Sequence, residues 1–295
     1  ITSHKHFSEN IVRVKYSQTE TVNKISNIKH PIFREVLKYF EIKGALELSS
    51  TADLPSGTGL GSSSSFTVGL LHNLFCRKKI KYNRKLLAEE ACKIEIEKLK
   101  EPIGKQDQYA AAFGGFNKME FGNNMARGDY RNVSGFGFCD QEIREVSEHL
   151  HLFYTGVTRE SKDILATQKE NLVSDNEVVH NMHHNVELAN QLAECLVMKD
   201  VDAIPITLRQ NWELKKKFAA SISNPELDRI YDVATTIGGA EAGKILGAGG
   251  GGFVLFFVKP ENQDKVKKAL SNLTFVPFKF ENSGSKVVVY QPNGF

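Results

Sequence analysis

Leu54-Pro-Ser-Gly-Thr-Gly-Leu-Gly-Ser-Ser-Ser-Ser-Phe-Thr-Val-Gly-Leu-Leu-His72 is a glycine- and serine-rich segment that lies between two regular patterns. Residues 45–53 before it alternate in polarity, as in a half-buried strand. The apolar residues after the serines recur at helical spacing. The sequence therefore predicts a strand, a glycine loop and a helix in succession.

This loop has the properties of a phosphate-binding site. Gly57, Gly59 and Gly61 let the backbone approach a ligand, and the start of the next helix offers unpaired N–H groups with partial positive charge. The serines at 62–65 can cap that helix, and one hydroxyl can reach a magnesium ion. A flexible Gly/Ser linker is the alternative, but the loop is short. It is not a Walker loop, because no Lys follows the last glycine.

Composition limits the class of protein. The 295 residues are 41% hydrophobic and 25% charged, which is typical of a soluble globular chain with one large domain or two ordinary ones. Basic residues are scattered and no apolar run is long enough to cross a membrane, so neither a nucleic acid nor a membrane is an expected partner. Four widely spaced cysteines favour reduced thiols in a cytoplasmic protein.

The remaining pattern alternates helices and strands. Helices are expected at 31–40, 85–98, 105–113, 161–171, 176–199, 201–219, 225–237 and 262–272. Strands are expected at 11–16, 116–121, 150–154, 253–258, 275–280 and 286–290. The glycine-rich residues 122–139 are expected to form an irregular loop.

A second glycine run, Gly247-Ala-Gly-Gly-Gly-Gly252, satisfies the pattern G-x-G-x-x-G. A dinucleotide-binding fingerprint would need a helix after it, but an apolar strand follows. We expect a tight turn between two strands, where another backbone or a ligand comes close. A simple hairpin turn is the alternative.

Several charged side chains are candidates for chemistry. Asp107, in the first turn of a predicted helix, can act as a general base with Lys105 holding developing charge, or can only cap the helix. Ser63 with Glu95 would suffice to hold magnesium, although glutamates on helices are usually just solvated. Arg159 and the run Lys215–Lys217, of which Lys215 is the first choice, are candidate anchors for a substrate phosphate, and exposed cations without such a role are the alternative.

Taken together, these strings resemble the GHMP small-molecule kinases, which include galactokinase and the homoserine, mevalonate and phosphomevalonate kinases. Residues 54–63 resemble the second motif of that superfamily, and residues 244–253 resemble the third. Within it, residues 104–116, 153–161 and 212–231 resemble the heptose 7-phosphate kinases. The resemblance extends over roughly residues 29–290.

The resemblance implies an α+β fold of two domains, 1–148 and 149–295, with the active site in the cleft between them. It implies an ATP- and Mg²⁺-dependent kinase that phosphorylates the anomeric hydroxyl of D-glycero-D-manno-heptose 7-phosphate. The 1,7-bisphosphate would serve the synthesis of nucleotide-activated heptose for bacterial surface polysaccharide. Alternatives are a related kinase for fucose or another sugar, and a non-catalytic binding or regulatory relative. The expected partners are a sugar phosphate and ATP, and the expected assembly is a monomer or homodimer.

Residue roles also follow from the resemblance. Asp107 would be the catalytic aspartate assisted by Lys105, and Ser63 and Glu95 would bind Mg²⁺, with Glu97 the second choice. The residues expected to bind the nucleotide are Pro55, Gly57, Gly59, Leu60, Gly61, Ser62, Ser63, Ser64, Gly247, Gly249, Gly250 and Gly251. The residues expected to bind the substrate are Gln106, Arg159 and Lys215. The family's first motif has no counterpart ahead of Ile1, so we expect these residues to be part of a longer chain.

Overall fold

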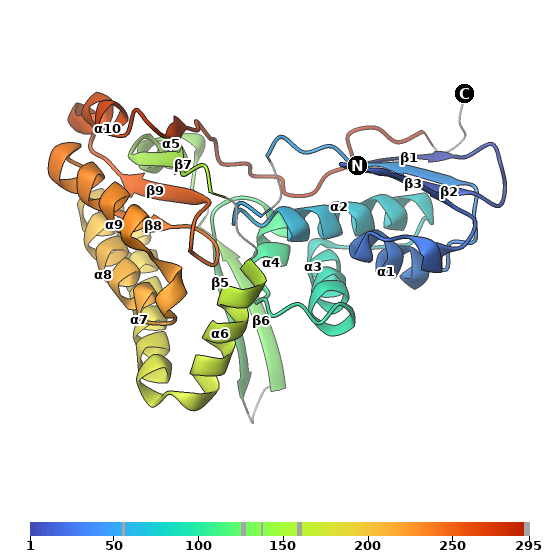
Figure 1. Cartoon of the computed structure of the whole chain (residues 1–295), viewed down its shortest axis with the longest axis horizontal. Coiled ribbons are helices and arrows are strands. Elements are labelled where there is room, and N and C mark those ends of the chain that lie inside the picture. The colour runs from blue at the N-terminus through green and yellow to red at the C-terminus, as the bar shows by residue number, and fades with distance from the viewer. Residues whose placement is uncertain (55–56, 125–127, 137, 158–160, 292–295) are drawn as a thin grey trace. The chain divides into compact units, whose positions relative to one another are not determined.

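The computed structural model describes residues 1–54, 57–124, 128–136, 138–157 and 161–291 (Figure 1). The chain forms two compact units. Unit 1 comprises Ile1–Pro55, Gly61–Gly115 and Glu281–Phe295, and unit 2 comprises Ser56–Leu60 and Phe116–Phe280. This division differs from a single boundary at residue 148, because part of the glycine loop belongs to unit 2 and the segment after Phe280 belongs to unit 1.

Unit 1 contains a four-stranded sheet in the order β1-β4-β2-β3. Its strands are β1 (Thr2–Lys5), β2 (Val12–Lys15), β3 (Thr19–Val22) and β4 (Leu46–Ser49). The pairing of β2 with β4 is parallel and the other two pairings are antiparallel. Val12 and Val14 of β2 are buried and alternate with half-buried residues, so one face of the sheet forms part of the core.

In the part of the chain that the structure describes, four α-helices belong to unit 1 (Figure 1). They are α1 (Pro31–Tyr39), α2 (Ser62–Arg77), α3 (Arg84–Cys92) and α4 (Gln106–Phe113). Helix α1 begins with Pro31 at its first position, where a missing N–H costs nothing, and the His30 ring accepts a hydrogen bond from the Phe33 N–H. A π-helical turn, Lys93–Lys98, continues α3. Helix α2 buries Val68, Leu71 and Phe75.

Unit 2 contains an antiparallel sheet in the order β10-β7-β9-β8 and a separate two-stranded hairpin. The sheet strands are β7 (Leu150–Tyr154), β8 (Ala242–Ile245), β9 (Phe253–Phe257) and β10 (Thr274–Phe275). The hairpin pairs β5 (Asn117–Asn124) with β6 (Gly128–Gly135). Strand β9 is buried along nearly its whole length, in agreement with its unbroken apolar sequence.

The helices of unit 2 pack around this sheet. They are α5 (Asp140–Glu148), α6 (Ser161–Ser174), α7 (Asn176–Met198), α8 (Ile204–Lys216), α9 (Pro225–Asp232) and α10 (Gln263–Ala269). Trp212 of α8, only 2% exposed, shares a core cluster with Phe153 of β7 and Phe256 of β9. Asp175 and Asn224 cap the N-termini of α7 and α9 with their side chains. The apolar faces of helix and sheet thus bury one another.

Three of the expectations for secondary structure are wrong. Residues 122–139 are not an irregular loop, because β6 lies within them and pairs with β5. The strand expected at 275–280 is limited to Thr274–Phe275. Residues 286–290 join no sheet in the described part of the chain, and Val288 and Val289 are 83% and 75% exposed. A β-branched sequence forms a strand only where a partner strand is available to pair with it.

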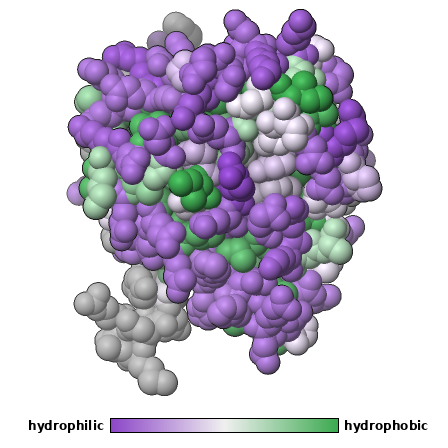
Figure 2. Space-filling model, turned by 90° about the vertical axis from the view of Figure 1, so that its left-hand side faces the viewer, coloured by the Kyte–Doolittle hydropathy of each residue, from purple (hydrophilic) through white to green (hydrophobic). Residues whose placement is uncertain are grey.

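Within the described ranges, no helix combines the length and the apolar character that crossing a bilayer requires. On the face in Figure 2, hydrophilic residues predominate and the hydrophobic ones form separate spots. All four cysteines, Cys76, Cys92, Cys139 and Cys195, are free thiols.

Candidate active site

The glycine loop leads into helix α2 through three left-handed residues. Gly57, Gly59 and Gly61 have φ angles of 76°, 81° and 68°, which only glycine adopts readily. Gly61 is the N-cap of α2 and makes no side-chain capping bond. The expectation that a serine caps this helix is therefore wrong, because the glycine conformation brings Ser62 inside the first turn. The uncapped N–H groups of this turn suit an anion.

A buried carboxylate lies directly behind the first turn of α2. Ser63 Oγ donates a hydrogen bond to Glu95 Oε1 at 2.5 Å, and Gln108 Nε2 donates to Glu95 Oε2 at 2.7 Å. Glu95 and Gln108 are both 0% exposed, whereas Ser63 is exposed. Burial raises the pKa of Glu95, and the nearby charge of Asp107 adds to this effect, against the hydrogen bonds that lower it.

Glu95 owes its position to the π-helical turn that follows α3. This turn spans Lys93–Lys98, and wider turns of this type occur frequently at functional sites. Within it, Ile94 and Glu95 are buried, whereas Glu97 is exposed. The structure thus separates the two glutamates that the sequence left as alternatives, and only Glu95 contacts Ser63.

Asp107 lies beside the start of α2. A Cβ atom added to Gly61 would stand 3.2 Å from Asp107 Cγ and 3.3 Å from Asp107 Oδ2. Desolvation by the surrounding protein raises the pKa of Asp107, although the residue as a whole is exposed. The N-cap of α4 is Lys105, which makes no side-chain capping bond, and Gln106 is exposed next to it. Asp107 makes no capping hydrogen bond within the described residues, so a role as helix cap gains no support.

Within unit 2, the second glycine run forms a turn that lies against the first part of the glycine loop. A Cβ atom on Gly247 would stand 2.6 Å from Gly59 Cα, and one on Gly252 would collide with Thr58 O. A small hollow at this contact is lined by Gly57, Thr58, Gly59, Leu246, Ala248, Gly249 and Gly251. The expectation that another backbone comes close to this turn is confirmed, and Gly250 and Gly251 are buried in it.

Of the two basic residues predicted to bind substrate, Lys215 is described by the structure and Arg159 is not. Lys215 donates hydrogen bonds from Nζ to Ile245 O at 2.8 Å and to Gly247 O at 2.7 Å. Burial, together with the nearby Lys244 ammonium, lowers the pKa of Lys215 to about 7. Arg159 and Pro55 lie outside the described residues.

The residues of unit 1 fit a magnesium ion that accompanies nucleotide phosphates. Mg²⁺ prefers one or two protein oxygens, with phosphates and waters completing its coordination. The hydroxyl of Ser63 and the carboxylate of Glu95 are such oxygens, already in contact, and a cation would relieve the cost of ionising a buried carboxyl. No group of three or more His, Cys, Asp or Glu side chains suited to a metal occurs among the described residues, so a site made by protein ligands alone gains no support.

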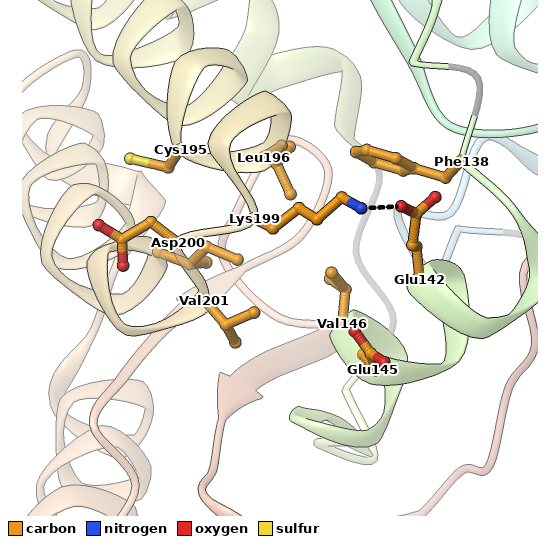
Figure 3. Close-up of a pocket in the computed structure, with 10 residues that line it drawn as sticks. Phe138, Glu142, Glu145, Val146, Cys195, Leu196, Lys199, Asp200 and Val201 are labelled. Carbon is orange, nitrogen blue, oxygen red and sulfur yellow. Dashed lines mark ion pairs between the residues drawn. The ribbon is translucent and has the colours of Figure 1, made fainter.

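Another hollow in unit 2 contains none of the predicted site residues. Its walls come from α5, the end of α7 and the residues that follow it, and Figure 3 shows Lys199 and Glu142 pointing toward each other inside it. Their ion pair measures 2.5 Å, and chiefly through Lys199 the pKa of Glu142 falls to about 2. We assign this hollow no part in the phosphate site.

Two site residues were missed in the sequence. Gln108 follows Asp107 on α4 but points inward to Glu95, and Thr58 is buried between glycines. A helical projection of α4 could have revealed that neighbouring residues face different sides.

Comparison with known proteins identifies relatives of this chain. Residues 26–115 match the N-terminal domain of the GHMP kinases, and residues 191–275 match their C-terminal domain. The chain is 36% identical over 240 residues to the D-glycero-alpha-D-manno-heptose 7-phosphate kinase of Campylobacter jejuni, covering 81% of this chain and 69% of that protein. It is 24% identical to the bifunctional fucokinase/GDP-fucose pyrophosphorylase of Arabidopsis thaliana, covering 75% of this chain but only 20% of that protein.

A solved structure shares the fold. The D-glycero-D-manno-heptose 1-phosphate kinase of Bacteroides thetaiotaomicron superposes with a TM-score of 0.75 at 24% identity. The match covers 98% of this chain and 87% of that one. The α+β architecture expected from the sequence is confirmed.

Proposed function

Because the chain belongs to the GHMP kinases, we propose that it phosphorylates the anomeric hydroxyl of D-glycero-D-manno-heptose 7-phosphate with ATP. The choice of sugar is supported by the 36% identity to a heptose 7-phosphate kinase. The observation that carries the proposal is the grouping of Ser63, Glu95 and Asp107 at the start of α2. Each of these parts suits one task in phosphoryl transfer. The uncapped helix terminus suits the phosphates, the paired hydroxyl and carboxylate suit a metal ion, and the separate carboxylate suits the acceptor hydroxyl.

The first part of the proposal concerns the nucleotide. The N–H groups at Gly57–Ser64 would hold the phosphates of ATP, and the turn at 247–251 would support that loop. Ser63 and Glu95 would hold Mg²⁺, which supplies positive charge next to the phosphates. Pro55 lies outside the described residues, and its contact with the nucleotide stays a prediction from the sequence.

The second part concerns the acceptor hydroxyl. Phosphoryl transfer has a loose transition state, so the protein contributes mainly position and charge. Asp107, with its raised pKa, would accept the hydroxyl proton or orient the hydroxyl for in-line attack. Lys105 would offset negative charge that develops beside it. Since Asp107 makes no capping bond in the described part of the chain, its carboxylate is available for this role.

The third part concerns the sugar phosphate. Gln106 is exposed next to Asp107 and would contact the sugar. Arg159 remains our candidate for the 7-phosphate, because a guanidinium matches a phosphate with two parallel hydrogen bonds. Lys215 was the other candidate, and its contacts with two backbone carbonyls favour a different role, which is argued below. We further propose that the reaction takes place in the cytoplasm and supplies surface polysaccharide synthesis.

The test is an assay of ADP release over a panel of sugars and sugar phosphates with MgATP. We expect turnover with D-glycero-D-manno-heptose 7-phosphate and little with the unphosphorylated sugar. Turnover on fucose or another free sugar, without turnover on the heptose phosphate, would reject the choice of substrate. ATP binding without turnover on any sugar would favour a non-catalytic relative.

A further inference from the structure

Lys215 connects helix α8 to the glycine turn of unit 2. It lies in the last turn of α8, and its ammonium group reaches two carbonyl oxygens on either side of Leu246. The two distances, 2.8 Å to Ile245 O and 2.7 Å to Gly247 O, are those of charge-assisted hydrogen bonds. An ammonium group held this way has little freedom to reach a mobile substrate.

The helix that carries Lys215 is itself firmly anchored. Trp212 on α8 is 2% exposed and stacks on Tyr231 with ring centroids 6.4 Å apart. One turn before Lys215, Asn211 accepts a hydrogen bond from the Lys244 ammonium and donates one to the Asn185 side chain. The Lys215 amine therefore projects from a rigid support rather than from a loop.

The contact with Gly247 determines the orientation of a peptide group. A trans peptide is planar, so a Gly247 carbonyl directed at Lys215 turns the Ala248 N–H the opposite way. Ala248 lines the hollow shared with Gly57, Thr58 and Gly59. A Cβ atom on Gly247 would stand 2.6 Å from Gly59 Cα, so there is no space for a side chain at Gly247. A rotation of this peptide would disturb both the N–H group and the loop that it touches.

The positive charge of two lysines next to the glycine turn favours the binding of an anion there. The Lys244 ammonium repels that of Lys215 and adds to the effect of burial on the Lys215 pKa, so two like charges lie near each other here. Their burial disfavours the charged form of each, lowering the pKa of Lys244 to about 8. A bound polyphosphate would offset this cost.

We propose that Lys215 is a positioning residue for the nucleotide, which holds the Gly247–Ala248 peptide so that the turn and the glycine loop receive the phosphates of ATP. This inference rests on the proposed function, in that it assumes ATP as the ligand. It assigns Lys215 to nucleotide binding through the backbone, not to the phosphate of the sugar.

The experiment measures MgATP affinity by titration calorimetry without sugar, and separately the KM of the sugar phosphate. The variant is Lys215→Met, which keeps the length of the side chain and removes the charge, with Lys265→Met on the exposed side of α10 as matched control. Loss of two charge-assisted hydrogen bonds should weaken MgATP binding about tenfold or more. The KM for sugar phosphate should stay within about twofold. Lys215→Arg, which can donate to both carbonyls, should recover part of the affinity.

Each outcome decides the matter. Unchanged MgATP affinity in a folded Lys215→Met variant overturns the inference while leaving the proposed function intact. A rise confined to the KM of the sugar phosphate also overturns it and would assign Lys215 to binding of the substrate phosphate. Absence of MgATP binding by the unaltered protein rejects both proposals. If Lys215→Met does not fold, Lys215→Gln provides the comparison, and wild-type affinity in that variant would also overturn the inference.

Discussion

Asp107 and Gly61 lie so close together that a side chain on Gly61 would crowd the carboxyl group of Asp107. A Cβ atom on Gly61 would stand 3.2 Å from Asp107 Cγ. Gly61 is also left-handed, with φ of 68°, and is the N-cap residue of helix α2. The position of the proposed catalytic carboxylate and the start of the phosphate-binding helix are thus determined together.

Gly61→Ala should therefore impair catalysis more than folding. The left-handed conformation costs a residue with a side chain about 1–2 kcal/mol, and the methyl group must displace the Asp107 carboxyl by a few tenths of an ångström. We expect kcat to fall by about tenfold or more, since small misplacement of a catalytic group is costly. Steady-state kinetics with a melting curve would check this, and Gly69→Ala, inside α2, is the control. Equal effects from both variants would contradict the argument.

Asp107→Asn should abolish most turnover with little loss of stability. The amide keeps the shape but cannot accept the proton, and general-base contributions are roughly 10²–10⁴-fold in kcat. Because Asp107 makes no capping bond within the described residues, the melting temperature should hardly change. A clear drop in melting temperature with kcat nearly intact would return Asp107 to a structural role.

Glu95→Gln should raise the Mg²⁺ concentration needed for activity by about tenfold or more, because an amide is a poorer ligand than a carboxylate. Glu97→Gln is the comparison, since Glu97 lies exposed on the same π-helical turn and does not contact Ser63. Activity measured against Mg²⁺ at saturating ATP separates the two. A larger effect from Glu97→Gln would reassign the ligand.

His151 should make unit 2 less stable in mild acid. It is 4% exposed on β7, and burial, helped by Lys267 and His149, lowers its pKa to about 4. Between pH 6.5 and 4 the unfolded chain binds more protons than the folded one, so stability is complete above pH 6.5 and falls as the pH drops. The free energy of unfolding should decrease by about 2 kcal/mol between pH 7.5 and 5 from this residue.

Denaturant unfolding at both pH values would measure this loss, and His151→Leu should reduce it. An identical pH dependence in the variant would mean that other groups cause the acid sensitivity.

The sequence predicted those parts of the fold whose conformation depends on residues adjacent in the sequence. Pro31 and the helical spacing after it sufficed for α1, and the glycines between two apolar strands sufficed for the turn at 247–252. Strand β6 was missed, because its sequence is rich in turn-forming residues and its structure comes from pairing with β5. Strand formation depends on a partner that local patterns do not reveal.

The candidate site was predictable in composition but not in its contacts. Ser63 and Glu95 were paired in advance by resemblance, and the structure places them in contact. The partners of Lys215 lie 30 and 32 residues away in sequence, beyond the reach of periodicity or composition. The charge of Lys215 suggested that it binds a ligand, whereas its ammonium group donates hydrogen bonds to two backbone carbonyls.

The way the chain alternates between units affects how the protein can fold during synthesis. Unit 1 includes the segment from Glu281 onward, where Gly284 packs against the end of α4 and the Ser285 N–H donates a hydrogen bond to Ala111 O. All of unit 2 leaves the ribosome before that segment does. The contacts between this segment and α4, the helix that carries Asp107, can therefore form only after all of unit 2 has been synthesised. A chain that terminates before Glu281 would contain α4 without these contacts.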